Sequence, residues 1–123
     1  PHTLPPILTP LRPSVDAMIG DTVVLEGISI NPRRIIEDTR GPCLPPLGTT
    51  AQQMCVAQGQ LIVSVRIGSG RRHRTYRLRE DERVALRGGA LSFVGRPVRL
   101  SEGERRAGLT PVLLHFTWYA TRS

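Results

Sequence analysis

The segment LIVSVRI-GSG-RRHRTYRLR, residues 61–79, carries the clearest β-strand pattern in the sequence. Its first part has an aliphatic residue at every second position: Leu61, Val63, Val65 and Ile67. Side chains two positions apart share one face of a strand, so these four residues are expected to face the core. The glycines on either side of Ser69 predict a turn, after which residues 71–79 return antiparallel. The segment therefore predicts a hairpin with one core-facing side.

Two further strand patterns precede this hairpin. Residues 21–30 form a strand candidate in which neither face is cleanly polar, as expected of a covered strand. Asn31-Pro32 is a turn signal, and a short second strand is expected around Ile35 and Ile36.

The downstream half continues in the same way. Residues 83–94 predict a hairpin around Gly88-Gly89, residues 97–100 a short edge segment, and residues 101–109 a polar loop. The last strand is expected over residues 112–121. Four of its residues are predicted to face the core: Leu114, Phe116, Trp118 and Ala120.

The pattern is that of an all-β protein. It comprises seven to eight short strands with turn signals between them, and no convincing helix of ten residues. We expect an antiparallel β-sandwich or a partly open barrel, two architectures that the sequence does not separate. Residues 15–123 are expected to form this single β domain, preceded by an arm or linker at residues 1–14.

Composition sets broad limits on the class of protein. The chain of 123 residues has 39% hydrophobic and 22% charged residues, which are globular values. Its formal charge is +7, and all 17 basic residues are arginine. This bias has two readings: selection for bidentate anion recognition, or codon usage in a GC-rich genome, which we favour. No apolar run reaches the roughly 18–20 residues of a membrane span.

The first 13 residues, PHTLPPILTPLRP, include five prolines. Proline lacks an N–H and has a fixed φ, so this stretch is expected to be extended. One reading is a spacer between a membrane anchor and the domain. The other is an arm that docks on a protein partner through its apolar residues, Leu4, Ile7, Leu8 and Leu11. Because the chain starts at Pro1 rather than Met, we expect a processed or trimmed chain, in which an export signal would be missing.

A long loop carries the two cysteines. Residues 39–53 are rich in proline and glycine, and a loop of this length is expected to be tethered or functional. A Cys43–Cys55 disulfide would tether it and would indicate an oxidising compartment. The alternative is metal binding. A closed zinc site needs four ligands, however, and no histidine stands at ligand spacing from either cysteine, so we favour the disulfide and expect no metal.

The carboxylates before this loop resemble a catalytic pair. Glu37 and Asp38 are adjacent, however, and adjacent side chains on a strand point to opposite faces. We therefore favour a structural role, in which Asp38 accepts backbone N–H groups of the loop and Arg40 pairs with a carboxylate. No Gly-x-Ser-x-Gly elbow and no Walker-type phosphate loop occurs. We expect no enzyme activity and no cofactor, and keep a hydrolase with an unrecognised site as a minor alternative.

Basic residues gather on the hairpin of residues 66–79. The cluster comprises Arg66, Arg71, Arg72, His73, Arg74, Arg77 and Arg79. Five of them are the candidate anion-binding residues: Arg66, Arg71, Arg72, Arg74 and Arg77. A positive ribbon attracts polyanions, such as lipid phosphate, polysaccharide or nucleic acid. The alternative is a solvated strand face whose arginine stems cover apolar surface, with the acidic residues 80–82 neutralising part of the ribbon.

The cysteine loop and its flanks resemble a family pattern. The matching residues are Ile35-Ile36-Glu37-Asp38-Thr39-Arg40, then Cys43, Cys55, Ala57-Gln58-Gly59 and the aliphatic strand at residues 61–67. They are similar to the Val-x-Glu-Asp-Ser-Arg-Cys-Pro…Cys…Ala-Gly pattern of small exported, often lipoprotein-like proteins of Gram-negative bacteria, which are mostly uncharacterised. The resemblance implies export, a disulfide and a β-rich domain, and it implies no known reaction.

The functional expectation combines these observations. We expect a non-enzymatic accessory or interaction module that is exported and periplasmic, outer-envelope-associated or extracellular. It would bind protein partners in a larger bacterial envelope assembly through the proline-rich arm. The alternative is a polyanion-binding domain that uses the arginine hairpin of residues 66–79, with an anionic membrane surface among its partners.

Overall fold

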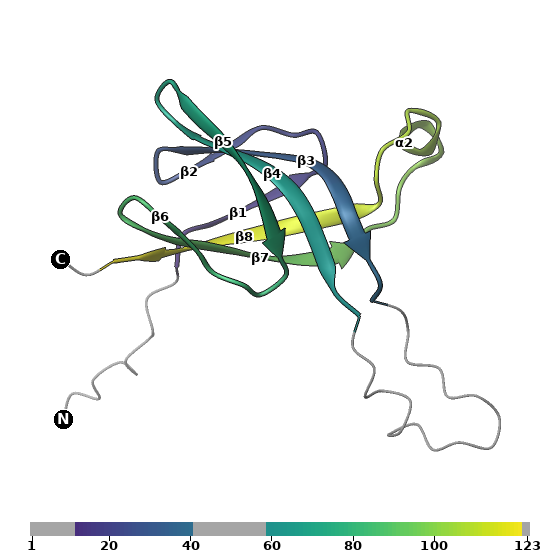
Figure 1. Cartoon of the computed structure of the whole chain (residues 1–123). Coiled ribbons are helices and arrows are strands. Elements are labelled where there is room, and N and C mark those ends of the chain that lie inside the picture. The colour runs from purple at the N-terminus through teal and green to yellow at the C-terminus, as the bar shows by residue number, and fades with distance from the viewer. Residues whose placement is uncertain (1–11, 41–58, 122–123) are drawn as a thin grey trace, which may run out of the picture.

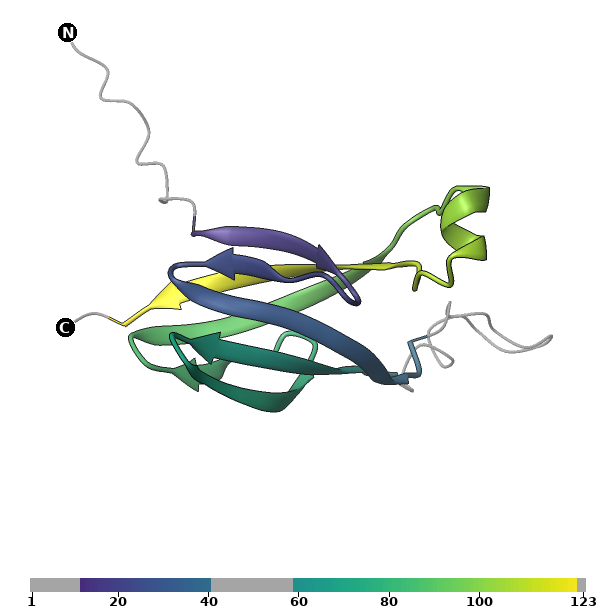
Figure 2. The same cartoon turned by 90° about the horizontal axis from the view of Figure 1, so that it is seen from above.

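The computed structural model describes residues 12–40 and 59–121. These residues form eight strands and one short helix: β1 (Ser14–Met18), β2 (Val23–Leu25), β3 (Ile28–Asp38), β4 (Leu61–Ser69), β5 (Arg72–Arg79), β6 (Val84–Leu86), β7 (Gly89–Pro97), α2 (Glu102–Arg106) and β8 (Val112–Ala120). All strand pairs are antiparallel. Helix α2 projects at one end of the molecule (Figures 1 and 2).

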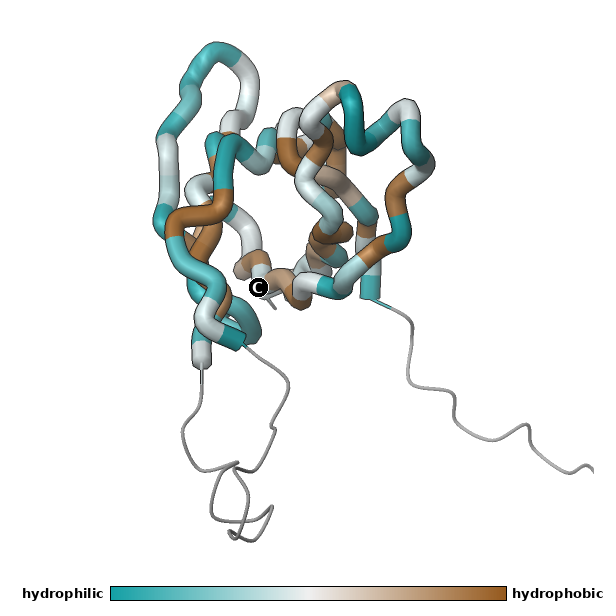
Figure 3. The backbone as a smooth tube through the Cα atoms, turned by 90° about the vertical axis from the view of Figure 1, so that its right-hand side faces the viewer, coloured by the Kyte–Doolittle hydropathy of each residue, from teal (hydrophilic) through white to brown (hydrophobic). Residues whose placement is uncertain are grey.

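The strands form two four-stranded sheets, with the orders β1-β8-β7-β6 and β2-β3-β4-β5. The all-β prediction is therefore confirmed. In the part of the chain that the structure describes, the sheets remain separate and do not close into a barrel, which matches the sandwich alternative. Figure 3 shows hydrophobic and hydrophilic residues alternating along the strands, the pattern that lets each sheet bury one face.

The core lies between the two sheets. The aliphatic face predicted for β4 is confirmed, since Leu61, Val63 and Val65 are fully buried. On the other sheet, Phe93 of β7 and Phe116 of β8 are also fully buried, with their ring centroids 5.8 Å apart. Burial of large apolar side chains from both sheets is the main stabilising contribution to such a domain. On β8, Leu114 and Trp118 are buried as expected, whereas Ala120, at the end of the strand, is exposed.

The region of residues 21–30 differs from the prediction. It is a hairpin and not one strand, because the chain reverses at Glu26 and Gly27 between β2 and β3. Both residues have positive φ, 51° and 76°, as a two-residue type I′ turn requires. Glutamate rarely adopts this conformation, so the sequence carried no strong turn signal here.

The turn predicted at Asn31-Pro32 is wrong, because β3 runs through both residues. The pairing with β4 shifts register between Pro32 and Arg34 and again between Ile35 and Glu37. Proline has no N–H to donate to a ladder, and a β-bulge is where a sheet tolerates it. The side chain of Pro32 is fully buried, so it contributes to the core.

The segment expected to be a polar loop contains α2. Ser101 and Glu104 form a capping box in which each side chain accepts the backbone N–H of the other residue. The Ser-x-x-Glu spacing was a readable signal for this helix start. No helix within residues 12–40 and 59–121 is long and apolar enough to cross a membrane.

Candidate anion-binding site on the β2-β3-β4-β5 sheet

The outer face of the β2-β3-β4-β5 sheet, which points away from the other sheet, is basic. Four cross-strand rows cover it from β3 through β4 to β5: Ser29–Gly68–His73, Asn31–Arg66–Thr75, Arg34–Ser64–Arg77 and Glu37–Ile62–Arg79. Directly paired residues point to the same side of a sheet. The alternate positions of β4, such as Val63 and Val65, are buried in the core, so these rows lie on the outer side.

A further arginine joins these rows from β3. Arg33 lies at the bulge, and its Nη1 donates to Asn31 Oδ1 at 3.2 Å, which places it on the same face. We call the five arginines of this surface the basic face: Arg33, Arg34, Arg66, Arg77 and Arg79. All five are exposed, and their guanidinium groups are therefore available to a partner.

The charge of the basic face is nearly uncompensated. Within the described parts of the chain, none of its five arginines forms an ion pair. The one acidic residue in the four rows is Glu37, whose carboxylate accepts a hydrogen bond from Gln60 Nε2. Like charges on neighbouring strands repel one another, so a bound anion would relieve this repulsion.

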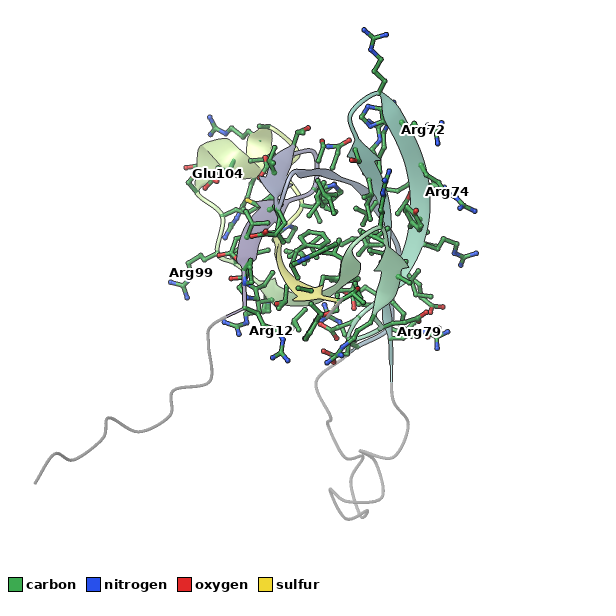
Figure 4. All side chains as sticks on the ribbon, turned by 90° about the vertical axis from the view of Figure 1, so that its left-hand side faces the viewer. Arg12, Arg72, Arg74, Arg79, Arg99 and Glu104 are labelled. Carbon is green, nitrogen blue, oxygen red and sulfur yellow. The ribbon has the colours of Figure 1, made fainter. Side chains whose placement is uncertain are left out.

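The five predicted anion-binding arginines do not form one cluster. Arg66 and Arg77 belong to the basic face, whereas Arg74 pairs with core-facing Ile67 and lies on the opposite side of the sheet. Arg72, two residues before Arg74, shares that opposite side, and Arg71 lies in the turn. Figure 4 labels Arg72, Arg74 and Arg79 along β5, and the register places Arg72 and Arg74 on its core-facing side and Arg79 on its outer side.

Two members of the basic face were missed from the sequence. Arg33 and Arg34 follow Asn31-Pro32, and the turn expected there separated them from the arginine hairpin. Arg34 pairs with Ser64 of β4 across the bulge after Pro32, in which Arg33 is the residue without a β4 partner. The adjacent Arg-Arg pair next to an aliphatic strand was the available signal.

The acidic residues after β5 do not neutralise the basic face as a group. Glu80 turns away, and its Oε2 accepts hydrogen bonds from Arg40 Nη1 and from the backbone N–H of Gly95, both at 2.8 Å. Asp81 and Glu82 are exposed in the loop between β5 and β6. The carboxylate nearest to β5 in sequence is therefore engaged in the link between the sheets.

The structural role predicted for Asp38 and Arg40 agrees with the geometry. Asp38 Oδ1 accepts from Arg40 Nε at 3.0 Å and from the Arg40 backbone N–H at 3.3 Å. The side-chain hydrogen bond from Arg40 lowers the pKa of Asp38, and the same bond raises the pKa of Arg40. Both charges are thus stabilised in the folded protein.

Some predicted site residues lie outside the described residues: Leu4, Ile7, Leu8, Leu11, Cys43 and Cys55. The docking arm and the disulfide stay predictions. Among the residues that the structure describes, no three His, Asp or Glu side chains converge in a way that could hold a metal ion.

Fold and site together define the class: a small two-sheet antiparallel β domain with an uncompensated arginine surface on one sheet. Comparison of the chain with protein-family models, with curated proteins and with solved structures finds no match. The resemblance to exported proteins of Gram-negative bacteria stays a prediction.

Proposed function

We propose that this domain is a non-enzymatic binding module whose basic face holds an extended polyanion. The observation that supports the proposal is the strand register, which gathers five exposed arginines from three adjacent strands on one face. Neighbouring strands are about 4.8 Å apart, and side chains on one face of a strand are about 7 Å apart. Such a grid suits a repeating array of anionic groups.

The guanidinium groups and the neutral side chains between them also suit a polyanion. A guanidinium donates two parallel hydrogen bonds to a phosphate, sulfate or carboxylate. Asn31, Ser64 and Thr75 lie in the same rows and offer neutral donors beside the charges. The one aromatic ring in the four rows is that of His73, in the row next to the β4–β5 turn, and a single ring offers no platform on which successive bases could stack. The supported contact is therefore with the anionic backbone or head groups of the partner.

The setting of this module follows the resemblance described above. We propose that it is exported and serves as an accessory subunit at the bacterial envelope, where anionic lipid head groups and acidic polysaccharides are the available polyanions. Protein partners that dock on the proline-rich arm are compatible with this role, because the basic face lies on the folded domain.

A salt series with three fluorescent probes tests the proposal: a sulfated polysaccharide, vesicles with anionic lipid, and a single-stranded oligonucleotide. If arginines neutralise the anion, log affinity falls linearly with log salt, with a slope near one per contact. The triple variant Arg34→Gln/Arg66→Gln/Arg77→Gln is expected to weaken binding at least about tenfold and to reduce the slope by about three.

A matched triple variant controls for net charge. Arg96→Gln/Arg99→Gln/Arg105→Gln removes the same charge from exposed residues off the basic face. Arg99 lies on the side of the molecule away from β5 (Figure 4). Binding by this variant is expected to change less than about threefold. Equal losses in the two triple variants, or binding without salt dependence, would contradict the proposal. The probe that binds most tightly identifies the polyanion class.

A further inference from the structure

Three hairpin turns meet at the end of the molecule opposite α2. They join β2 to β3, β4 to β5, and β6 to β7 (Figure 1). Between them lies an open cleft of about 1190 Å³. Its lining combines charged and apolar side chains, including Glu26, Arg72, Arg74, Tyr76, Leu86 and Arg87.

The cleft begins where the core ends. On the core-facing side of β5, Leu78 is buried and Tyr76 is half-buried, whereas Arg74 and Arg72 are exposed. This side of the hairpin thus emerges gradually from between the sheets towards its tip. The cleft is therefore continuous with the hydrophobic core at its floor and with solvent at its mouth, where the arginines lie.

The walls carry an excess of positive charge. Four arginines line the cleft, Arg71, Arg72, Arg74 and Arg87, against one carboxylate, that of Glu26. No ion pair involves any of these four arginines in the part of the chain that the structure describes. The guanidinium carbon of Arg74 lies 5.5 Å from the centroid of the Tyr76 ring, so a cation stands beside an aromatic surface.

The floor is apolar. Ile28 and Ile67 line it and are almost completely buried. Tyr76 and Leu86 also line it, and both pack against the core while staying partly exposed. An apolar floor below charged walls suits a ligand that carries both an apolar group and an anionic head.

We propose that this cleft binds a small amphipathic anion, a phosphate or carboxylate attached to an apolar group. The anionic head pairs with the guanidinium groups of Arg72, Arg74 and Arg87, and the apolar group covers Tyr76 and Leu86. This site is separate from the basic face, because Arg74 and Arg77 extend from opposite sides of β5. The proposal therefore does not depend on polyanion binding.

The test is a titration followed by ¹H–¹⁵N correlation spectra of the whole chain, with three probes. Phenyl phosphate and octanoate carry the two anionic heads on apolar groups, and inorganic phosphate is the head alone. Saturable shifts confined to the three turns are expected with at least one amphipathic probe, in the millimolar range or below. Inorganic phosphate is expected to bind at least about tenfold more weakly, since it leaves Tyr76 and Leu86 uncovered.

Two variants on β5 locate the site. Arg74→Gln and Arg77→Gln each remove one exposed arginine from the same strand, but from opposite faces. Arg74→Gln is expected to weaken the amphipathic anion at least about fivefold, and Arg77→Gln less than about twofold. Arg87→Gln removes a cleft arginine from another hairpin, the β6–β7 turn, and is also expected to weaken binding of the amphipathic anion. Shifts spread over the basic face, equal losses in the two β5 variants, or no saturation by about 10 mM would overturn the proposal.

Discussion

At the scale of single residues, Arg40 links the two sheets. It lies two residues after the end of β3, and its Nη1 donates to the carbonyl oxygen of Gly95 on β7 at 3.0 Å and to Glu80 Oε2 at 2.8 Å. The Gly95 N–H donates to the same Glu80 oxygen. One partly buried guanidinium thus joins backbone and carboxylate groups from distant parts of the chain, so its contribution exceeds that of an exposed ion pair.

The lowered pKa of Asp38 gives an acid-range prediction. As the pH falls, the unfolded chain protonates this carboxylate first, near its ordinary pKa of about 4. Its stabilising effect is therefore complete above that value and is lost as the pH falls through the lower pKa of the folded state. Asp38→Asn is expected to reduce the unfolding free energy by about 0.5–1 kcal/mol at pH 7 and to flatten its decline below about pH 4.

Urea unfolding between about pH 2.5 and pH 7 measures this effect. Asp81→Asn is the control, because it removes a carboxylate from an exposed loop residue that already has the positive φ that asparagine tolerates. If the Asp38→Asn curve ran parallel to that of the unchanged protein at every pH, the assignment of the acid-range stability to the Asp38–Arg40 pair would be wrong.

At the scale of the elements, Gly95 sets how closely β7 approaches β4. A Cβ added at this position would collide with the Leu61 side chain, which is fully buried in the facing sheet. Gly95→Ala is expected to destabilise the domain by about 1–3 kcal/mol through overpacking. Gly103→Ala, where nothing lies within 4 Å, is expected to be neutral or to stabilise α2 by up to about 1 kcal/mol. Thermal unfolding of both variants measures the difference. Equal melting temperatures for Gly95→Ala and Gly103→Ala would contradict the close approach of β7 to β4 at Gly95.

Strand β5 carries its arginines at the edge of its sheet. It is an edge strand of its sheet, and edge strands invite unwanted pairing unless charges protect them. Its first two arginines, Arg72 and Arg74, line the cleft, and its last two, Arg77 and Arg79, belong to the basic face. The same charges therefore protect the edge and supply both proposed binding surfaces.

At the scale of the whole molecule, the two ends of the domain differ. One end carries the three turns and the cleft, and at the other β3 and β4 run into the segment that contains the cysteines (Figure 1). The base of that segment is fastened by two hydrogen bonds, from Thr39 N–H to the Gln60 carbonyl at 3.0 Å and from Gln60 N–H to Thr39 Oγ1 at 2.8 Å. A Cys43–Cys55 disulfide would close a loop whose base is already paired.

Intact mass after alkylation tests the disulfide. The native protein is expected to take up no alkylating reagent, and the reduced, unfolded protein is expected to label both cysteines. Closing a loop of about 13 residues is worth roughly 3 kcal/mol in the chain-entropy model, so reduction should also lower the melting temperature. Labelling of native protein without reductant would contradict the disulfide and, with it, one argument for an oxidising compartment.

Several features were predictable because they depend on local patterns. The alternation of Leu61, Val63 and Val65 is enough to indicate a core strand, whatever its partners are. The divergence of Glu37 and Asp38, and the pairing of Arg40 with a carboxylate, also follow from neighbouring residues and agree with the observed contacts. The strong positive charge is a property of composition alone.

What only the tertiary structure decided is which arginines share a surface. The alternation of side chains separates Arg74 from Arg77. Arg34 joins Arg66 and Arg77, however, only through the pairing of β3 with β4, two strands that are separated by the 22 residues 39–60. That register includes bulges beside Pro32, and a shift of one residue would move each side chain to the other face. Register is set by long-range packing of the buried faces, so the sequence by itself determined the kind of sheet and its charge, and tertiary pairing determined the site.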